Sequence, residues 1–274
     1  MLASVDLSDR FSFLLTVLIT TTKIMNYFIS IIITAYNEEK SITAAFMDIK
    51  ETLSSLPFKN EIILVNDSST DKTEFEINEI ISSHKDVVSI NNNNNYGPGR
   101  SFTIGVKQAK GNIVIWMPAD TEVKSIEYLK YIKLFKNYDL ISFFHTNPRS
   151  RAFLRYIISL IFTKIMNLFF KTDLKYFNGP TAIRKDVYLQ FIPKSNRFFF
   201  AAESKLKAIK KGYSNIQVPI TLEEKKQSRT IRNIITPIKP SNVLDVLFSF
   251  LRLLWEIYFS KTFKLEQKIE RDFY

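Results

Sequence analysis

Carboxylates and hydroxyls gather directly after an apolar run in the segment Asp67–Asp71, which reads DSSTD. The run before it, EIILV at 61–65, has the composition of a buried strand. A carboxylate at the end of such a strand can accept hydrogen bonds from a nucleobase or a ribose, and the hydroxyls of Ser68, Ser69 and Thr70 suit the same ligand. The same hydroxyls are common helix N-caps, so the segment favours a nucleoside site without requiring one.

A second acidic segment, Met117–Glu122 with the sequence MPADTE, ends the apolar run NIVIWM at 112–117. Mg²⁺ is typically held by one or two carboxylates, while substrate phosphates and water complete its shell. Glu122 stands two residues after Asp120, so both side chains would face the same side of an extended backbone. The pattern favours a divalent-cation site, and a solvated acidic turn is the alternative.

The composition argues against several other kinds of chemistry. The chain has no cysteine, which excludes disulfides, thiolate catalysis and cysteine-bound zinc, and its two histidines argue against a histidine-built metal site. The formal net charge of +11 favours anionic partners such as acidic lipid head groups or phosphorylated small molecules. The arginines form no recognisable nucleic-acid-binding module, so no nucleic acid partner is expected.

The elements that must position these residues follow a regular alternation. Strands are predicted at 28–34, 61–65, 86–90 and 112–117, with a helix in each interval. Ser41 is the expected cap of the first helix, which runs to about Leu53. This alternation predicts an α/β fold with a mostly parallel sheet and flanking helices. Ligands bind beyond the carboxyl ends of such strands, where both polar segments lie.

Two later helices are predicted to be amphipathic, and their charges make crossing a bilayer costly. We therefore expect both to lie in a membrane interface, which satisfies both faces; packing on protein or in a dimer is the alternative. Their polar stripes comprise Arg155, Ser159, Thr163 and Asn167 in the first, and Asp245, Ser249, Arg252 and Glu256 in the second. The expected divisions are an extension at 1–27, an α/β domain at 28–235 containing the first helix at 152–171, and a membrane-associated helix and tail at 236–274.

Several motifs occur in one order along residues 28–235. They comprise IIITAYNEE at 31–39, EIILVNDSSTDKT at 61–73, Asn95-Tyr96-Gly97 with Gly105 and Gly111, and an acceptor-side pattern of Glu203, Leu206, Ala208, Gly212, Tyr213 and VPI at 218–220. Together they resemble family 2 glycosyltransferases, in the polyprenyl-phosphate branch typified by dolichol-phosphate mannose synthase. The resemblance implies a GT-A fold, which is a Rossmann-like nucleotide-sugar-binding fold, together with a nucleoside-diphosphate sugar donor and Mg²⁺ or Mn²⁺.

The resemblance also implies roles for individual residues. Asp120 would hold the metal-bound diphosphate, and Glu122 would be a second metal ligand. Glu203 falls at the acidic position of the acceptor region. The donor-binding set would comprise Ala35, Tyr36, Glu38, Asp67, Ser69 and Asp120, with Lys226, Arg229 and Arg232 closing over the diphosphate. Residues expected at the acceptor are Arg149, Arg151 and Arg155, whose forks suit a lipid phosphate, and Asn178 and Thr181 of a family turn.

One departure from the family pattern bears on activity. The metal motif normally has two acids separated by one residue, and the first position here is Pro118, so Asp120 must act alone or with Glu122. A phosphate acceptor needs no general base, whereas a sugar hydroxyl would need one, for which Glu203 is the candidate.

Three functions are therefore considered. The leading one is inverting sugar transfer to polyprenyl phosphate at the cytoplasmic face of the membrane by a peripheral or monotopic enzyme. The second is transfer to a sugar hydroxyl during surface polysaccharide assembly. The third, motivated by Pro118, is a catalytically silent nucleotide-sugar binder or membrane scaffold.

Overall fold

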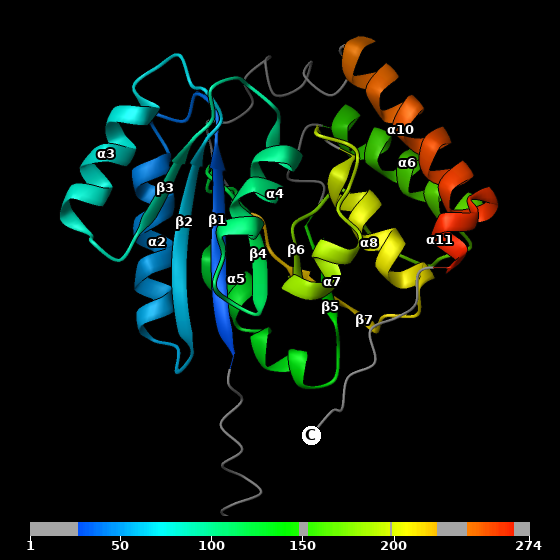
Figure 1. Cartoon of the computed structure of the whole chain (residues 1–274), viewed down its shortest axis with the longest axis horizontal. Coiled ribbons are helices and arrows are strands. Elements are labelled where there is room, and N and C mark those ends of the chain that lie inside the picture. The colour runs from blue at the N-terminus through cyan, green and yellow to red at the C-terminus, as the bar shows by residue number, and fades with distance from the viewer. Residues whose placement is uncertain (1–26, 148–152, 198, 224–239, 266–274) are drawn as a thin grey trace, which may run out of the picture.

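The computed structural model describes residues 27–147, 153–197, 199–223 and 240–265 of the 274-residue chain. Within them a seven-stranded sheet runs through the middle of the molecule, with helices on both faces (Figure 1). The strands are β1 (Phe28–Ala35), β2 (Lys59–Asn66), β3 (Val88–Asn91), β4 (Ile113–Pro118), β5 (Leu140–His145), β6 (Thr181–Arg184) and β7 (Asn215–Ile220). Their order across the sheet is β3-β2-β1-β4-β6-β5-β7.

The sheet is mostly parallel, as the alternating pattern predicted. β1 pairs in parallel with both β2 and β4, and β5 pairs in parallel with β7. β6 lies between β4 and β5 and is antiparallel to both. Strand β1 is covered on both faces, since Ile31, Ile32 and Ile33 are all 0% exposed. This explains why β1 reads as a continuous apolar run instead of an alternating one.

The helices divide between the two faces of the sheet. One face packs against α2 (Ile42–Ser54), α3 (Thr73–Ser83), α5 (Ser125–Leu129) and a 3₁₀ turn at Ile132–Lys136. The other packs against α4 (Pro98–Gln108), α6 (Phe153–Phe170), α7 (Lys185–Gln190), α8 (Phe200–Lys210), α10 (Pro240–Phe259) and α11 (Lys261–Leu265). On this second face α4 approaches β1 so closely that a Cβ on Gly105 would lie 2.5 Å from Cγ2 of Ile32.

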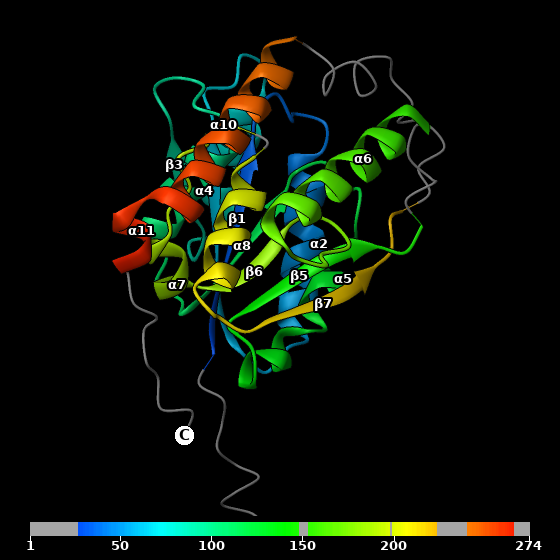
Figure 2. The same ribbon diagram turned by 90° about the vertical axis from the view of Figure 1, so that its right-hand side faces the viewer.

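Helices α6 and α10 lie side by side on the outside of that second face (Figures 1 and 2). The Tyr258 hydroxyl of α10 donates a hydrogen bond to the carbonyl of Phe169 at 2.9 Å, and the rings of Phe169 and Phe250 lie 5.3 Å apart. The two helices therefore form one surface. Within the described residues, no helix has both the length and the apolar character needed to cross a bilayer.

The polar stripe of α10 faces the protein. The sequence pattern alone suggested an interfacial helix in which this stripe would face the water. Ser249 is only 3% exposed, and both Arg252 and Glu256 contact charged side chains of α8. The side turned outward is apolar instead. Its exposed residues are Val243, Leu244, Leu247, Phe248, Leu251, Trp255 and Phe259 of α10, beside Leu154, Leu160, Ile161, Ile165, Leu168 and Phe169 of α6. We call these thirteen residues the outer apolar face.

Candidate functional site

The loops that follow β1 and β2 are joined at the carboxyl edge of the sheet. The amide of Asp67 donates to the carbonyl of Ala35 at 2.8 Å, and the amide of Asn37 donates to Oγ of Ser69 at 3.1 Å. In return, Oδ1 of Asn37 accepts the amide of Thr70 at 2.8 Å. Two segments that the sequence assigned to one nucleoside pocket therefore lie in direct contact.

Neither predicted helix cap acts through its side chain in the expected way. The Ser41 hydroxyl donates to the carboxylate of Glu38 and makes no capping bond to α2. At the start of α3 it is Asp71, not the three hydroxyls before it, that accepts the amide of Thr73 at 3.0 Å. Burial acts to raise the pKa of Asp71, yet hydrogen bonds from Thr73 and from the amide of Glu39 bring that pKa below its usual value.

Two of the residues expected in the base pocket differ sharply in exposure. Tyr36 is 42% exposed and can offer its ring to a ligand. Ala35 is 1% exposed, and its carbonyl is already held by Asp67.

Left-handed backbone marks the end of each strand in this region. Asn37 after β1 has a φ of 58°, Ser68 after β2 has 60°, and Thr121 after β4 has 53°. Residues with side chains rarely adopt such angles, and they cost on the order of 1–3 kcal/mol each unless surrounding contacts hold them. Such strain clusters at ligand sites, so its coincidence with all three loops supports a site at this edge.

Asp67 is buried, and its carboxylate is hydrogen-bonded to other residues of the protein. Its carboxylate is 3% exposed and accepts hydrogen bonds from four donors of the chain, among them the amide of Gly97 at 2.8 Å and the Ser101 hydroxyl at 2.7 Å. The other two donors are the amide of Tyr96 and the side-chain amide of Asn92. Asp67 therefore fixes the loop before α4, and the idea that it also contacts a nucleoside stays a prediction. The sequence placed Asn95-Tyr96-Gly97 of this loop in a family motif but did not predict its bonds to Asp67; Gly97 adopts a φ of 89°.

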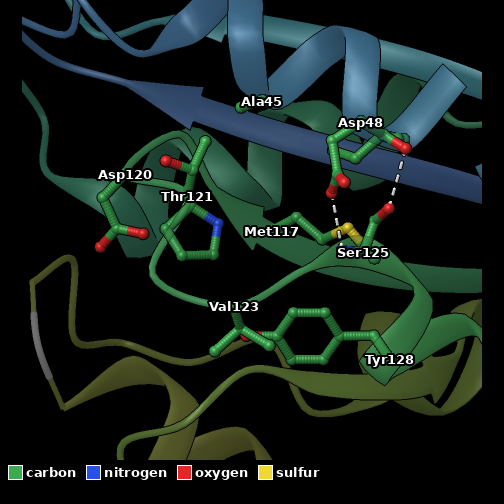
Figure 3. A pocket seen from close by; sticks show the side chains of 10 residues that line it. Ala45, Asp48, Met117, Asp120, Thr121, Val123, Ser125 and Tyr128 are labelled. Carbon is green, nitrogen blue, oxygen red and sulfur yellow. Dashed lines mark hydrogen bonds between the residues drawn. The ribbon is translucent and has the colours of Figure 1, made fainter. Parts of the chain in front are cut away.

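Asp120 stands in a turn directly after β4, beside the loops of β1 and β2. Pro118 is the last residue of the strand and pairs in register with Thr34 of β1. Oδ1 of Asp120 then accepts the amide of Glu122 at 3.1 Å, and Thr121 between them is left-handed. The backbone from Asp120 to Glu122 forms a turn and is not extended. The expectation that the two carboxylates share one side assumed an extended backbone, and that assumption was wrong. Figure 3 shows the Asp120 carboxylate pointing away from Asp48 and Ser125.

The residues of this turn fit a metal ion only in a particular way. Among the described residues, no group of three or more acidic or histidine side chains gathers as a metal cage. Pro118 offers no side-chain donor, which leaves Asp120 and Glu122 as the acids of the turn. A Mg²⁺ or Mn²⁺ ion that takes most of its ligands from a diphosphate and from water fits such a donor set.

Glu203 is not placed to act as a general base, which corrects its predicted catalytic role. Its carboxylate, on α8, is 0% exposed and accepts the amides of Lys194 at 2.9 Å and Ser195 at 3.0 Å. The cations of Lys207 and Arg252 lie 2.8 and 3.0 Å from its two oxygens. A general base must reach the proton that it removes. Both oxygens of this carboxylate are instead bonded to amides and cations of the protein itself.

The contacts of Glu203 belong to an ion cluster between α8 and α10, in which Glu203 and Lys207 are buried and Arg252 and Lys194 are partly exposed. Lys207, 3% exposed, also lies 3.0 Å from Glu256, which in turn lies 3.3 Å from Lys194. Burial acts to raise the pKa of Glu256, but the ammonium groups of Lys207 and Lys194 hold that pKa below its usual value. The cluster of Glu203, Lys207, Arg252, Glu256 and Lys194 thus ties the polar side of α10 to the domain.

Asn178 and Thr181 lie at the same strand edge, and each carries a buried side-chain oxygen with no hydrogen-bond partner in the structure. Thr181 opens β6, where Ala182 pairs with Ile115 of β4. Continuing that register would bring Asn178 opposite Ala119, next to Asp120. Their assignment to the acceptor stays a prediction, but unpartnered buried oxygens are what a ligand with hydroxyls could satisfy.

Lys205 is a buried cation that sequence reasoning missed. It is 0% exposed, and its ammonium donates to the carbonyls of Tyr176 and Phe177 at 3.2 and 3.3 Å. Burial lowers the pKa of Lys205 to about 7. The two carbonyls come directly before Asn178, so Lys205 holds the turn that leads into β6.

The predicted basic residues fall largely outside the described residues. These are Arg149, Arg151, Lys226, Arg229 and Arg232, and for Arg155 only the backbone is described. Both described flanks meet at the site: Asn147 exchanges hydrogen bonds with Leu222, and the amide of Glu223 donates to the carbonyl of Glu122 at 2.8 Å. Glu223, the last described residue before 224–239, therefore lies next to the turn that carries Asp120.

Comparison with known proteins agrees with this architecture. The sequence profile of glycosyl transferase family 2 matches residues 30–191. The chain is 30% identical over 137 residues to an undecaprenyl-phosphate 4-deoxy-4-formamido-L-arabinose transferase of Pseudomonas fluorescens, covering 49% of this chain and 40% of that protein. It is 30% identical over 105 residues to the bactoprenol glucosyl transferase of Shigella phage SfV, covering 38% of this chain and 34% of the relative. The chain thus spans less than half the length of these relatives.

Solved structures show the same fold. Glucosyl-3-phosphoglycerate synthase from Mycobacterium tuberculosis, in complex with Mn²⁺, UDP and glucosyl-3-phosphoglycerate, superposes with a TM-score of 0.62 at 15% sequence identity. The match covers 83% of this chain and 80% of that one. At this identity the likeness supports the GT-A fold alone. Since the profile match covers more than half of the chain and the strand-end loops fall within it, the protein belongs to glycosyl transferase family 2.

Proposed function

We propose that this protein transfers a sugar from a nucleoside-diphosphate sugar to a polyprenyl phosphate at a membrane surface, with inversion at the anomeric carbon. One observation carries the proposal: the strand-end turn of Asp120 and the outer apolar face occur in one domain, where α6 begins only a few residues after β5 ends at that edge. A site for a phosphorylated donor and a surface for lipid are both needed for such a reaction.

The donor side of the proposal rests on the joined loops. Tyr36, Glu38 and Ser69 would contact the nucleoside, while Asp120 and Glu122 would hold the metal-bound diphosphate. The metal ion, Mg²⁺ or Mn²⁺, would stabilise the negative charge of the departing nucleoside diphosphate. Lys226, Arg229 and Arg232 are proposed to add to this charge stabilisation, because Glu223, the last described residue before 224–239, lies beside Glu122.

The acceptor side is supported by the inaccessibility of Glu203. A sugar hydroxyl must lose its proton to become a good nucleophile, whereas a phosphate monoester is already ionised near neutral pH and needs no base. Burial of the one predicted base therefore favours a phosphate acceptor over a sugar hydroxyl. The names of the undecaprenyl-phosphate and bactoprenol relatives point in the same direction.

The membrane part of the proposal rests on the orientation of α10. A monomeric protein in water exposes few contiguous apolar patches, yet thirteen large apolar side chains of α6 and α10 face outward here. Arg252 and Glu256 of α10 are held by the ion cluster and do not interrupt that face. Exposed lysines nearby, Lys164 of α6 and Lys261 and Lys264 of α11, suit anionic head groups at the cytoplasmic face.

A turnover assay tests the chemistry. Protein in detergent is given a panel of nucleotide sugars with Mg²⁺ or Mn²⁺, with and without polyprenyl phosphate, and released nucleotide and the mass of new lipid are measured. We expect nucleotide release that depends on the lipid phosphate. Release that depends on a saccharide acceptor would replace the proposal with transfer to a hydroxyl. Donor binding without any turnover would identify a silent binder.

Vesicle flotation tests the membrane surface. The full chain should float with vesicles containing anionic lipid, and Phe248→Asp, on the outer apolar face, should weaken flotation. Phe75→Asp is the matched control, because Phe75 on α3 is 60% exposed and Phe248 is 66% exposed. Equal flotation of both variants, or a stable dimer in place of vesicle binding, would contradict the proposed membrane contact.

A further inference from the structure

Asp48 of α2 reaches behind the turn that carries Asp120. Oδ2 of Asp48 accepts the amide of Ser125, the first residue of α5, at 2.7 Å, and its Oδ1 lies 3.4 Å from the ammonium of Lys124. The side chain of Asp48 is 24% exposed, whereas that of Lys124 is 55% exposed. The bond to the amide of Ser125 is therefore the better shielded of the two contacts, and a shielded, charge-assisted bond contributes more than an exposed ion pair.

Ser125 makes the attachment to α2 complete. It is 2% exposed, and its hydroxyl donates to the backbone carbonyl of Asp48 at 2.9 Å. The same hydroxyl lies 2.6 Å from Oγ1 of Thr52, one turn further along α2. Backbone and side chain of Ser125 are thus both bound to one helix, and α2 itself is anchored in the core by Phe46, Ile49 and Leu53.

The turn is consequently fastened at both of its ends. Pro118 is fixed at the near end by the pairing of β4 with β1, and Ser125 is fixed at the far end by Asp48. Between them Thr121 adopts a φ of 53°. A β-branched residue keeps such an angle only where its surroundings impose it, so the attachment at Ser125 is part of what holds the turn in shape.

The space between α2 and the turn is small. A cavity of about 20 Å³ lies there, lined among others by Asp48, Ser125, Asp120 and Thr121 (Figure 3). That volume holds about one water molecule. Asp48 therefore acts on the turn and not on a substrate.

We propose that Asp48 is a positioning residue for Asp120, which through Ser125 holds the turn in the shape that binds the donor diphosphate. The inference rests on the proposed function in one respect, namely that the donor binds at Asp120. It adds a residue of α2 that lies outside the motifs of the sequence.

The kinetic test compares three variants of the full chain. Asp48→Ala removes the acceptor of the Ser125 amide, and the KM for the nucleotide sugar should rise about 10-fold, the equivalent of one charge-assisted hydrogen bond. The KM for the acceptor should not change. Asp48→Asn keeps an oxygen at the same place and should recover most of the donor affinity. Lys124→Ala removes only the exposed ion pair and should behave as wild type.

Two outcomes would overturn the proposal. One is an unchanged donor KM in Asp48→Ala. The other is an equal rise of both KM values together with a lowered melting temperature, which would identify a general packing role. Glu51→Ala, an exposed change on the same helix, controls for effects of α2 itself.

Hydrogen exchange separates failure of this inference from failure of the proposed function. Amides of residues 119–125 should exchange faster in Asp48→Ala than in wild type or in Asp48→Asn, while amides of α4 should not change. This measurement needs no turnover. Unchanged exchange at 119–125 would overturn the positioning role even for an active enzyme, and faster exchange would support it even for an enzyme with no identified acceptor.

Discussion

The turn after β4 and the interface between α8 and α10 each carry a carboxylate that the sequence marks as catalytic, and the structure treats them in opposite ways. Asp120 lies in a turn at the edge of the sheet, where its Oδ1 accepts the backbone amide of Glu122 at 3.1 Å. Glu203 is 0% exposed and is surrounded by two amides and two cations of its own chain. An acid in a family motif can therefore be left accessible to a ligand in one region and be tied into the protein in the other, and its neighbours decide which.

The two regions also differ in where their polar groups point. At the strand edge, hydroxyls, amides and carboxylates collect in loops beside solvent, and left-handed residues shape those loops. Between α8 and α10, Glu203 and Lys207 are buried, while large apolar side chains of α10 face outward. The first arrangement suits a polar ligand in water, and the second suits an apolar environment.

The largest effect that separates the regions is expected from Glu203→Ala. Removing this carboxylate leaves the buried cation of Lys207 without one of its partners, so the free energy of unfolding should fall by about 3–5 kcal/mol. Chemical denaturation measures it, with the exposed change Glu51→Ala as the control. Full stability combined with a large loss of turnover would mean that Glu203 is catalytic after all.

Asp120→Asn is the matching experiment in the other region. Turnover should fall about 100-fold or more, because the charge that binds the metal and diphosphate is lost, while the melting temperature stays close to that of wild type. Nucleotide release measures the first quantity and thermal denaturation the second. The control is Asp86→Asn, whose side chain is 80% exposed. Near-normal turnover would remove Asp120 from the site.

Lys205→Met tests the stability effect of a buried lysine that is bonded to backbone carbonyls, in contrast to Lys207, which is paired with carboxylates. The pKa of Lys205 is lowered to about 7, so between that pH and the ordinary lysine value of 10.5 the unfolded chain binds more protons than the folded one. The unfolding free energy of wild type should therefore rise with pH in this window, by about 1.4 kcal/mol per unit from this group alone.

Methionine fills a similar volume without a charge. The stability advantage of Lys205→Met should be greatest at or below about pH 7 and should shrink steadily as the pH rises towards 10. Denaturation of both proteins over this range measures the difference. A difference that does not change with pH would show that Lys205 keeps an ordinary pKa in the folded protein.

Ser68→Gly should produce the smallest effect. Ser68 has a φ of 60°, which glycine adopts without strain, so the free energy of unfolding should rise by about 1 kcal/mol. Ser68→Ala keeps the Cβ and should give no such gain. If glycine instead lowers the stability, the side chain of Ser68 has a role in the loop that outweighs the backbone strain.

Much of the first region could be predicted from the sequence because its signals are local. Strands β1, β2 and β4 were expected within a few residues of where they lie, since each is a short apolar run bounded by polar turns. The strand ends that carry Asn37, Asp67 and Asp120 followed from the rule for parallel sheets. The four donors that bury Asp67 could not be foreseen, because they come from a loop some thirty residues further along the chain.

The second region could not be predicted in the same way, because its contacts are distant in sequence. Periodicity located the polar stripe of α10, yet a helix with that stripe turned inward has the same period as one with it turned outward. The orientation is settled by contacts between distant residues, such as that of Arg252 with Glu203, 49 residues apart. The antiparallel insertion of β6 was also unforeseen, since four residues carry little pattern.

The pairing of β5 with β7 has a consequence for the order in which the chain folds. The parallel ladders of β1, β2 and β4 lie within residues 28–118, whereas Leu140 of β5 must wait for Asn215 of β7. During synthesis the donor half can close its sheet first, because its loops are shorter and cost less entropy to form. Helix α6 is made long before α10 can pack beside it, so a nascent chain presents α6 without this neighbour for the time needed to make about 70 more residues. A chaperone or the membrane could therefore bind α6 before α10 is available to pack against it.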